Sequence, residues 1–191
     1  MSLLLPLISF LNEKKLCTPN VEKLRICQEC GATCCRSGPI VLTIFDISRL
    51  CKYLNVSIDE FIEKYVQIVS GEDYAKFFNL EISNEVLHKL RKVIYITLKS
   101  RSDGSCIFLE NNLCKVYPAR PLTCRVFPLR IGGTIKKCPL SSEGKLLRDE
   151  EKEYSKYLQE NFKHAVIYMK CLDQHDGDVD NLVKCLISHV P

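Results

Sequence analysis

Cysteines at chelating spacings are the residues of this chain with the clearest chemical meaning. Two groups of four contain Cys27, Cys30, Cys34 and Cys35, and then Cys106, Cys114, Cys124 and Cys138. Two thiolates two residues apart on a tight turn can both reach one metal ion about 2.3 Å away. Eight thiolates suffice for two tetrathiolate sites or for one polynuclear cluster, so we predict that these eight residues bind metal. The alternative is that some of them are small buried apolar residues or a disulfide pair.

The kind of metal is left open by the cysteine spacing. Four thiolates suit both zinc and an iron–sulfur cluster. The first group matches neither ferredoxin pattern, and Ser37 stands where the third cysteine of a radical-enzyme triplet would fall. Successive side chains point apart, so we expect the adjacent Cys34 and Cys35 to serve neighbouring metals.

The other four cysteines are Cys17, Cys51, Cys171 and Cys185. They lie in segments without a chelating spacing, and we interpret them as small packing residues of the core. A disulfide between Cys171 and Cys185 is the alternative, since intracellular proteins of hyperthermophiles can carry such bonds.

Length, charge and hydropathy narrow the class of protein. The 191 residues, 12 of them cysteine, form a chain too long to need a disulfide scaffold, and a net charge of +4 does not favour a nucleic-acid partner. Residues 1–12 are apolar but lack the flanking signals of a signal peptide, and no apolar run is long enough to span a membrane. We therefore expect a cytoplasmic protein, in which clustered cysteines are ligands more often than disulfides.

The segment between the two cysteine groups predicts short elements. Residues 39–45 are apolar and β-branched, which favours a buried strand. A pair of short helices is predicted within 46–69, with Asp46 as the cap of the first and a capping box at Ser57 for the second. The polar residues 70–83 predict a loop.

The second half of the chain predicts two further strands, a hairpin and two helices. Strands are expected at 93–98 and 106–109, and a hairpin around the glycine pair at 132–133. Apolar residues at helical spacing predict helices over 146–171 and 179–189. The fold class is therefore α+β, with a small loop-rich core organised by metal. We predict one domain over residues 1–191, with a metal-binding core at 27–140 and a helical extension at 141–191.

The residues around the cysteines carry a resemblance. After the first group come Leu42-Thr43 and Asp46, then Asp103-Gly-x-Cys106-x-Phe-Leu109, then Cys114-x-Val-Tyr117-x2-Arg-Pro121-x2-Cys124-Arg125-x-Phe-Pro128. This pattern resembles the zinc- or iron-chelating CxxCxxCC domain family over about residues 27–138. One departure is that three residues, rather than the two of the family's name, precede the paired cysteines.

The resemblance implies a metal centre whose reaction is unassigned. Members are often described as iron–sulfur cluster proteins or oxidoreductases, and the cysteine pattern is similar to that of flagellin lysine N-methylases. Methyl transfer from S-adenosylmethionine usually needs a nucleotide site, often with a glycine-rich turn, and only one adjacent glycine pair is present here.

Three arginines next to the cysteines are candidates for contacts with the bound metal centre. Two tetrathiolate zinc sites would each carry a formal charge of minus two, which Arg36, Arg120 and Arg125 could offset while donating hydrogen bonds to sulfur. The alternative for Arg120 and Arg125 is an ion pair with a carboxylate such as Asp46.

No set of catalytic residues is evident in the sequence. The four histidines are scattered, and no nucleophile elbow, P-loop or zinc-protease motif is present. We therefore predict a metal-binding protein that holds zinc or an iron–sulfur cluster. The alternatives are an iron–sulfur redox enzyme, a lysine N-methylase, and an interaction module whose protein partner docks on the helix at 146–171.

Overall fold

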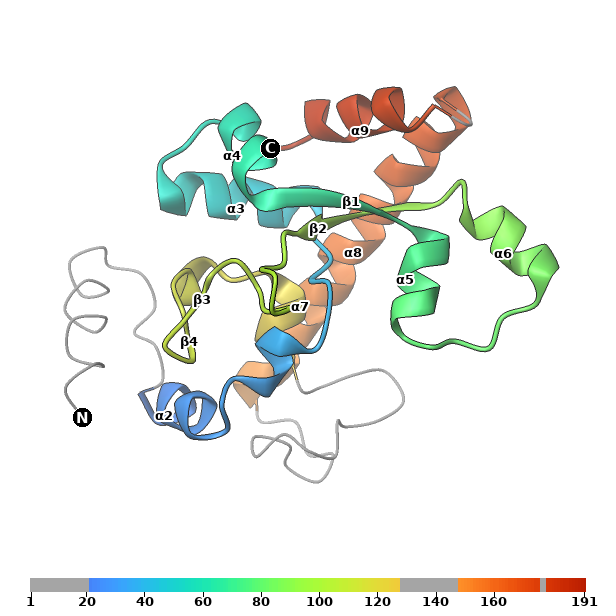
Figure 1. Cartoon of the computed structure of the whole chain (residues 1–191). Helices are drawn as coiled ribbons and strands as arrows, with labels where there is room; N and C mark the ends of the chain where they lie inside the picture. Colours follow the sequence, from blue (N-terminus) through green and yellow to red (C-terminus); the bar gives the residue numbers. More distant parts are fainter. Residues whose placement is uncertain (1–20, 128–147, 176–177) are drawn as a thin grey trace.

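The computed structural model describes residues 21–127, 148–175 and 178–191 (Figure 1). Short helices surround small antiparallel pairs of strands, which confirms the α+β class. Within these ranges no helix is both long and apolar enough to cross a membrane. The predicted hairpin at 132–133 lies outside the described residues.

The elements of the first half alternate helices with one pair of strands. They are α2 (Val21–Glu29), the 3-10 helix η1 (Thr33–Arg36), α3 (Ile44–Leu54), α4 (Ile58–Tyr65), β1 (Val66–Ser70), α5 (Gly71–Phe77), α6 (Asn84–Leu90) and β2 (Ile94–Leu98). Strands β1 and β2 pair antiparallel, with Val66 opposite Leu98 and Ser70 opposite Ile94. The strand predicted at 93–98 is confirmed, and α5 and α6 occupy the connection between the two strands (Figure 1).

Helix α3 begins where a strand was expected. The prediction over 39–45 is wrong, because only Val41 forms an isolated bridge, to Thr97, and the helix starts at Ile44. Thr43 is the cap of this helix: its hydroxyl accepts from the backbone N–H of Asp46, and the Asp46 carboxylate accepts from the backbone N–H of Thr43. Asp46 is therefore the third residue of a capping box rather than the cap itself.

Two more boundaries differ from the sequence prediction. Residues 66–69 continue as β1 instead of extending α4, because they pair with β2 and three of the four, Val66, Ile68 and Val69, are apolar and β-branched. The expected loop at 70–83 contains α5, which begins at Gly71. Ser70 caps this helix, because its hydroxyl accepts from the backbone N–H of Asp73. Ser57 caps α4 as predicted, accepting from the backbone N–H of Glu60, but the Glu60 carboxylate pairs with Lys64 rather than completing the predicted capping box.

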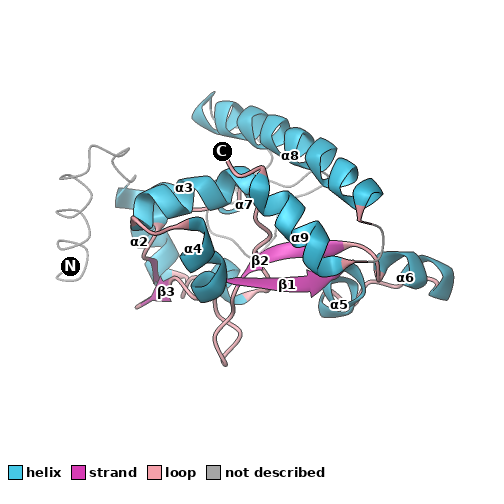
Figure 2. Cartoon of the chain, turned by 90° about the horizontal axis from the view of Figure 1, so that it is seen from above, coloured by secondary structure: helices cyan, strands magenta, loops and turns pink. Residues whose placement is uncertain are grey.

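The second half contains the short elements β3 (Leu109–Glu110), β4 (Leu113–Cys114), η2 (Tyr117–Ala119) and α7 (Leu122–Arg125), then the long helix α8 (Arg148–Gln174) and the shorter α9 (Val179–Ser188). Helices α8 and α9 confirm the sequence prediction. α8 crosses behind the β1–β2 pair in Figure 1, and Figure 2 shows the same arrangement from above.

The C-terminal helices complete the core of the protein. Cys171 of α8 and Leu182 and Leu186 of α9 belong to the same buried cluster as Leu50 and Phe61 of α3 and α4. The opposite face of α8 exposes four large apolar side chains: Leu158, Phe162, Val166 and Met169. The protein partner expected for this helix stays a prediction.

Candidate metal centre

The first cysteine group lies on a tight reversal of the chain between α2 and η1. Gly31 and Ala32 adopt left-handed φ angles of 72° and 52°, which turn the backbone sharply after the helix. The backbone N–H of Ala32 donates to the carbonyl of Cys27 at 2.9 Å, and the Cys30 thiol lies 3.3 Å from the same oxygen. The turn therefore gathers Cys27 and Cys30 at the end of α2 and continues into η1, which carries Cys34 and Cys35.

Backbone pairing joins the second cysteine group to the first. The backbone N–H of Cys106 donates to the carbonyl of Cys35 at 2.8 Å, and Cys106 also bridges to Ser100. The predicted strand at 106–109 is reduced to this bridge and to β3, which pairs Leu109 with Cys114 of β4. Cys114 thus lies on a small hairpin next to Cys106.

A buried carboxylate positions the helix that carries Cys124. The backbone N–H of Leu122, the first residue of α7, donates to Asp46 Oδ1 at 2.9 Å. Asp46 is 1% exposed, so this bond ties the start of α7 rigidly to the start of α3. The loop before α7 is held by Arg125, whose guanidinium donates to the carbonyl oxygens of Pro118 and Arg120.

Four thiols from these elements lie in one another's electrostatic field. Cys34 raises the pKa of Cys106, Cys114 and Cys124 by like-charge repulsion. Cys106 acts in the same way on Cys114 and Cys124, and Cys114 acts on Cys124. Because such repulsion falls with distance, all six pairs are neighbours. We call Cys34, Cys106, Cys114 and Cys124 the thiol cluster.

Burial is the main reason that most of these thiols resist ionisation. It raises the pKa of Cys106, raises that of Cys114 to about 12, and raises that of Cys124 well above its usual value. For Cys34 the largest cause is a hydrogen bond with the Cys35 thiol, followed by burial. Without a cation the cluster is therefore neutral, and a bound metal would supply the positive charge that thiolates need.

The thiol cluster is gathered but is not in ligand geometry. Among the described residues, only the possible ligand atoms of Cys171, Cys185 and His189 form a set of three within 4.8 Å of one another. No three sulfurs of the thiol cluster are that close together. The four cluster sulfurs must therefore approach one another to bind one ion. Their donor chemistry fits zinc or iron, since all four are thiols of partly or fully buried residues.

The remaining predicted ligands lie around this cluster. Cys35 contacts Cys34 through their thiols, so these two adjacent side chains do not point apart as expected. Cys27 is close enough to Tyr117 to raise the pKa of the tyrosine, although burial is the larger cause. Cys30 lies on the turn with Cys27. Cys138 falls outside the described residues.

The three arginines predicted next to the metal have different partners. Arg36 donates to the carbonyl of Gly31, to Asn112 and to Asp103, so it links the two cysteine blocks. Arg120 lies over the Tyr117 ring, 3.8 Å from its centre, and its positive charge counteracts the raised pKa of Cys114 and Cys124. Arg120 is therefore close enough to these thiols to act on their charge, and its contact with a bound metal centre stays a prediction.

The guanidinium that pairs with Asp46 is that of Arg49, which the sequence prediction did not include. Arg49 also donates to Glu160 of α8 at 2.6 Å. The spacing of three residues between Asp46 and Arg49 on one helix was the signal that could have revealed the pair. The expectation that Arg120 or Arg125 pairs with Asp46 is replaced by this assignment.

The cysteines assigned to packing divide into two cases. Cys51 is buried on α3, as predicted. Cys171 and Cys185 form a disulfide between α8 and α9. The alternative interpretation of this pair, a disulfide, is therefore correct, and the interpretation as free packing residues is wrong. Cys17 lies outside the described residues.

His164 of α8 packs near the buried ion pair and should make stability depend on pH. Burial lowers its pKa, although Asp46 partly opposes the shift, and Nδ1 has no hydrogen-bond partner among the described residues. As the pH falls, His164 therefore takes up a proton in the unfolded chain, near its ordinary pKa of about 6.5, before it does so in the folded protein. The free energy of unfolding should fall as the pH decreases below that value.

Urea unfolding between about pH 5 and 7.5 measures this dependence. In His164→Gln the loss of stability toward acid should be smaller than in the unaltered protein. His88→Gln, on the exposed surface of α6, serves as the control and should keep the original slope. Identical slopes in the His164→Gln variant and the unaltered protein would contradict the assignment.

Comparison with known proteins agrees with the cysteine arrangement. A family model described as "CxxCxxCC: Putative zinc- or iron-chelating domain" matches residues 26–161. An uncharacterized protein of Methanocaldococcus jannaschii is 28% identical over 156 residues, which cover 79% of this chain and 71% of that protein. No solved structure matches the chain.

Proposed function

Because the chain belongs to the CxxCxxCC family of zinc- or iron-chelating domains, we propose that it is a metal-binding protein whose thiol cluster holds one ion. The ligands in this proposal are Cys34, Cys106, Cys114 and Cys124. The observation that carries it is the proximity of these four thiols, which come from three separate segments of the chain and would each oppose the ionisation of another.

The gathering of these thiols suits a bound cation. Without an ion, the four neighbouring thiols from η1, the 106–114 segment and α7 behave as small, weakly polar side chains that stay protonated. A bound divalent ion would turn that arrangement into a stabilising one, since thiolate–metal bonds contribute directly to folding. Arg120 supports the proposal because its charge would offset the negative charge of a tetrathiolate site.

A second ion is proposed for the other four predicted ligands, Cys27, Cys30, Cys35 and Cys138. The adjacent pair then divides between the sites, with Cys34 in the thiol cluster and Cys35 facing the second. This division is supported by the position of Cys27 and Cys30 on one turn directly before η1. Zinc or an iron–sulfur cluster would satisfy either set of donors.

Elemental analysis of the full chain, purified without oxygen, tests the proposed function. We expect about two zinc per chain in colourless protein, or iron with sulfide and absorbance near 400 nm in brown protein. Complete removal of the metal by a chelator should lower the melting temperature and the helical circular dichroism signal, because the metal links η1, β4 and α7. Metal-free protein with unchanged spectrum and melting temperature would refute a structural metal centre.

A further inference from the structure

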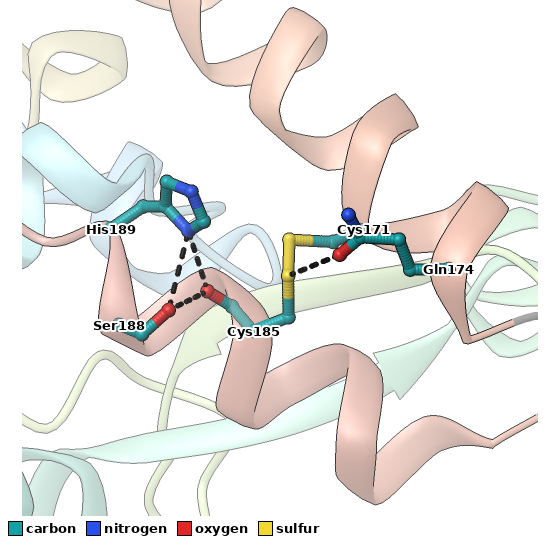
Figure 3. The surroundings of a disulfide bond; sticks show 5 residues. All are labelled: Cys171, Gln174, Cys185, Ser188 and His189. Atoms are coloured by element: carbon teal, nitrogen blue, oxygen red, sulfur yellow. Dashed lines mark hydrogen bonds between the residues drawn. A yellow bond between two sulfur atoms is a disulfide. The ribbon is translucent and has the colours of Figure 1, made fainter.

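A second group of metal-ligand side chains lies at the C-terminal helix pair. Cys171 belongs to α8, Cys185 to α9, and His189 follows the last residue of α9 (Figure 3). The possible ligand atoms of these three residues lie within 4.8 Å of one another. All three residues fall outside the span 26–161 that the family model matches, so this group is independent of the thiol cluster and of its proposed function.

Two of the three ligand atoms are bonded to each other. The disulfide between Cys171 and Cys185 leaves neither sulfur as a thiolate, the form that binds metal. We propose that reduction of this disulfide creates a Zn²⁺ site from Cys171, Cys185 and His189. The oxidation state of one cysteine pair would then decide whether the ion is bound.

The chemistry of this switch balances with a dithiol reductant. One reductant thiolate attacks the sulfur of Cys185 and releases Cys171 as a thiolate, which takes a proton. The second reductant thiol then displaces Cys185, so that the reductant becomes a disulfide and the chain gains two thiols. Zn²⁺ binding afterwards releases the two thiol protons.

The burial of the two cysteines decides which sulfur a reductant attacks. Cys171 is 0% exposed, whereas Cys185 is half-buried and His189 is exposed. A reductant can therefore reach Cys185 first. The same exposed side gives the ion a path to the site and leaves room for water as a fourth ligand, as in zinc sites with three protein ligands.

The packing of α9 should keep the ligands together after the disulfide is broken. Leu182 and Leu186 are almost completely buried in the same core cluster as Cys171, so the two helices are held by apolar contacts as well as by the bond. Cys185 and His189 are four residues apart, which places them on one side of the helix end. His189 Nδ1 lies 2.8 Å from the carbonyl oxygen of Cys185, and this contact holds the imidazole beside the disulfide (Figure 3).

A neighbouring amide also fits the reduced form. Gln174 Oε1 lies 3.8 Å from Cys185 Sγ (Figure 3). In the disulfide this sulfur carries no proton, so the contact can become an S–H···O hydrogen bond only after reduction.

The test measures zinc binding by the full chain in both oxidation states. Protein is treated with dithiothreitol or with buffer, freed of reductant without oxygen, equilibrated with zinc chloride and desalted. We expect one more zinc per chain in the reduced sample by mass spectrometry of the metal. Because reduction can also restore thiols elsewhere, the extra zinc must depend on the proposed ligands.

Two histidine variants test whether the extra zinc depends on the proposed ligands. His189→Ala keeps the disulfide but removes one ligand, and it should weaken binding of the extra zinc at least about tenfold. His175→Ala, at the end of α8, is the matched control and should bind the extra zinc as the unaltered chain does. The proposal is overturned if reduced and untreated protein hold equal zinc, or if His189→Ala binds as tightly as His175→Ala. Neither result would bear on the metal content of the thiol cluster.

Discussion

Replacing Cys124 with alanine should remove the metal of the thiol cluster and lower the stability of the protein markedly. Cys124 lies on α7 and is close to the other three thiols of the cluster, so its loss leaves only three ligands. Structural zinc contributes roughly 10 to 16 kcal/mol in zinc-finger peptides, which equals or exceeds the net stability of most domains. We expect Cys124→Ala to contain about one metal ion fewer per chain and to melt at a markedly lower temperature.

Cys51→Ala is the matched control, because Cys51 is also buried but lies on α3 with its thiol 4.0 Å from the carbonyl of Ser57. It should keep the full metal content and lose only about 1 kcal/mol, as for other small core truncations. Metal analysis and thermal melts of both variants, purified without oxygen, test whether the thiol cluster binds the metal. Undiminished metal in Cys124→Ala, or equal metal loss in both variants, would show that the thiol cluster is not the site.

Replacing Asp46 with alanine should destabilise the protein by about 3 to 5 kcal/mol, the typical cost of leaving one member of a buried ion pair without its partner. The carboxylate accepts from the backbone N–H and hydroxyl of Thr43 and from the N–H of Leu122, and it pairs with Arg49. Its removal leaves these donors unsatisfied in a buried place and releases the start of α7. Because α7 carries Cys124, the metal affinity should also fall, by about 10- to 100-fold, as for other residues that position ligands.

Asp73→Ala offers a control with the same local role. Asp73 takes part in the equivalent contacts with Ser70 at the start of α5, but its side chain is 67% exposed. Its loss should cost about 1 kcal/mol or less and leave metal binding unchanged. Urea unfolding and zinc competition on both variants measure the two effects. Similar losses of stability in the two variants would show that Asp46 is only a helix cap.

The parts of the fold that the sequence predicted correctly are those with a strong local pattern. The strand at 93–98 and the helices α8 and α9 follow from β-branched composition and from helical periodicity. The errors lie where a short apolar run is compatible with two structures. Residues 39–45 form the approach to α3 instead of a strand because the capping box at Thr43 starts a helix, and residues 66–69 form a strand because β2 lies beside them.

The candidate site shows the same division. Cysteine spacing predicted a set of candidate ligands, since chelation by neighbouring thiolates is a local property. It did not predict that Asp46 anchors α7, because Leu122 is 76 residues further along the chain. Arg49 was missed for a related reason: its pairing with Glu160 depends on the packing of α3 against α8.

The sequence by itself determined the donor chemistry, the family and the two C-terminal helices, because these depend on residue type and on spacing along a few turns of chain. Only the tertiary structure decided that Cys34 lies with Cys106, Cys114 and Cys124, and that Cys171 is bonded to Cys185. The partners in these contacts are separated by 14 to 90 residues along the chain. Their meeting depends on the burial of apolar faces by the whole molecule, which no local pattern contains.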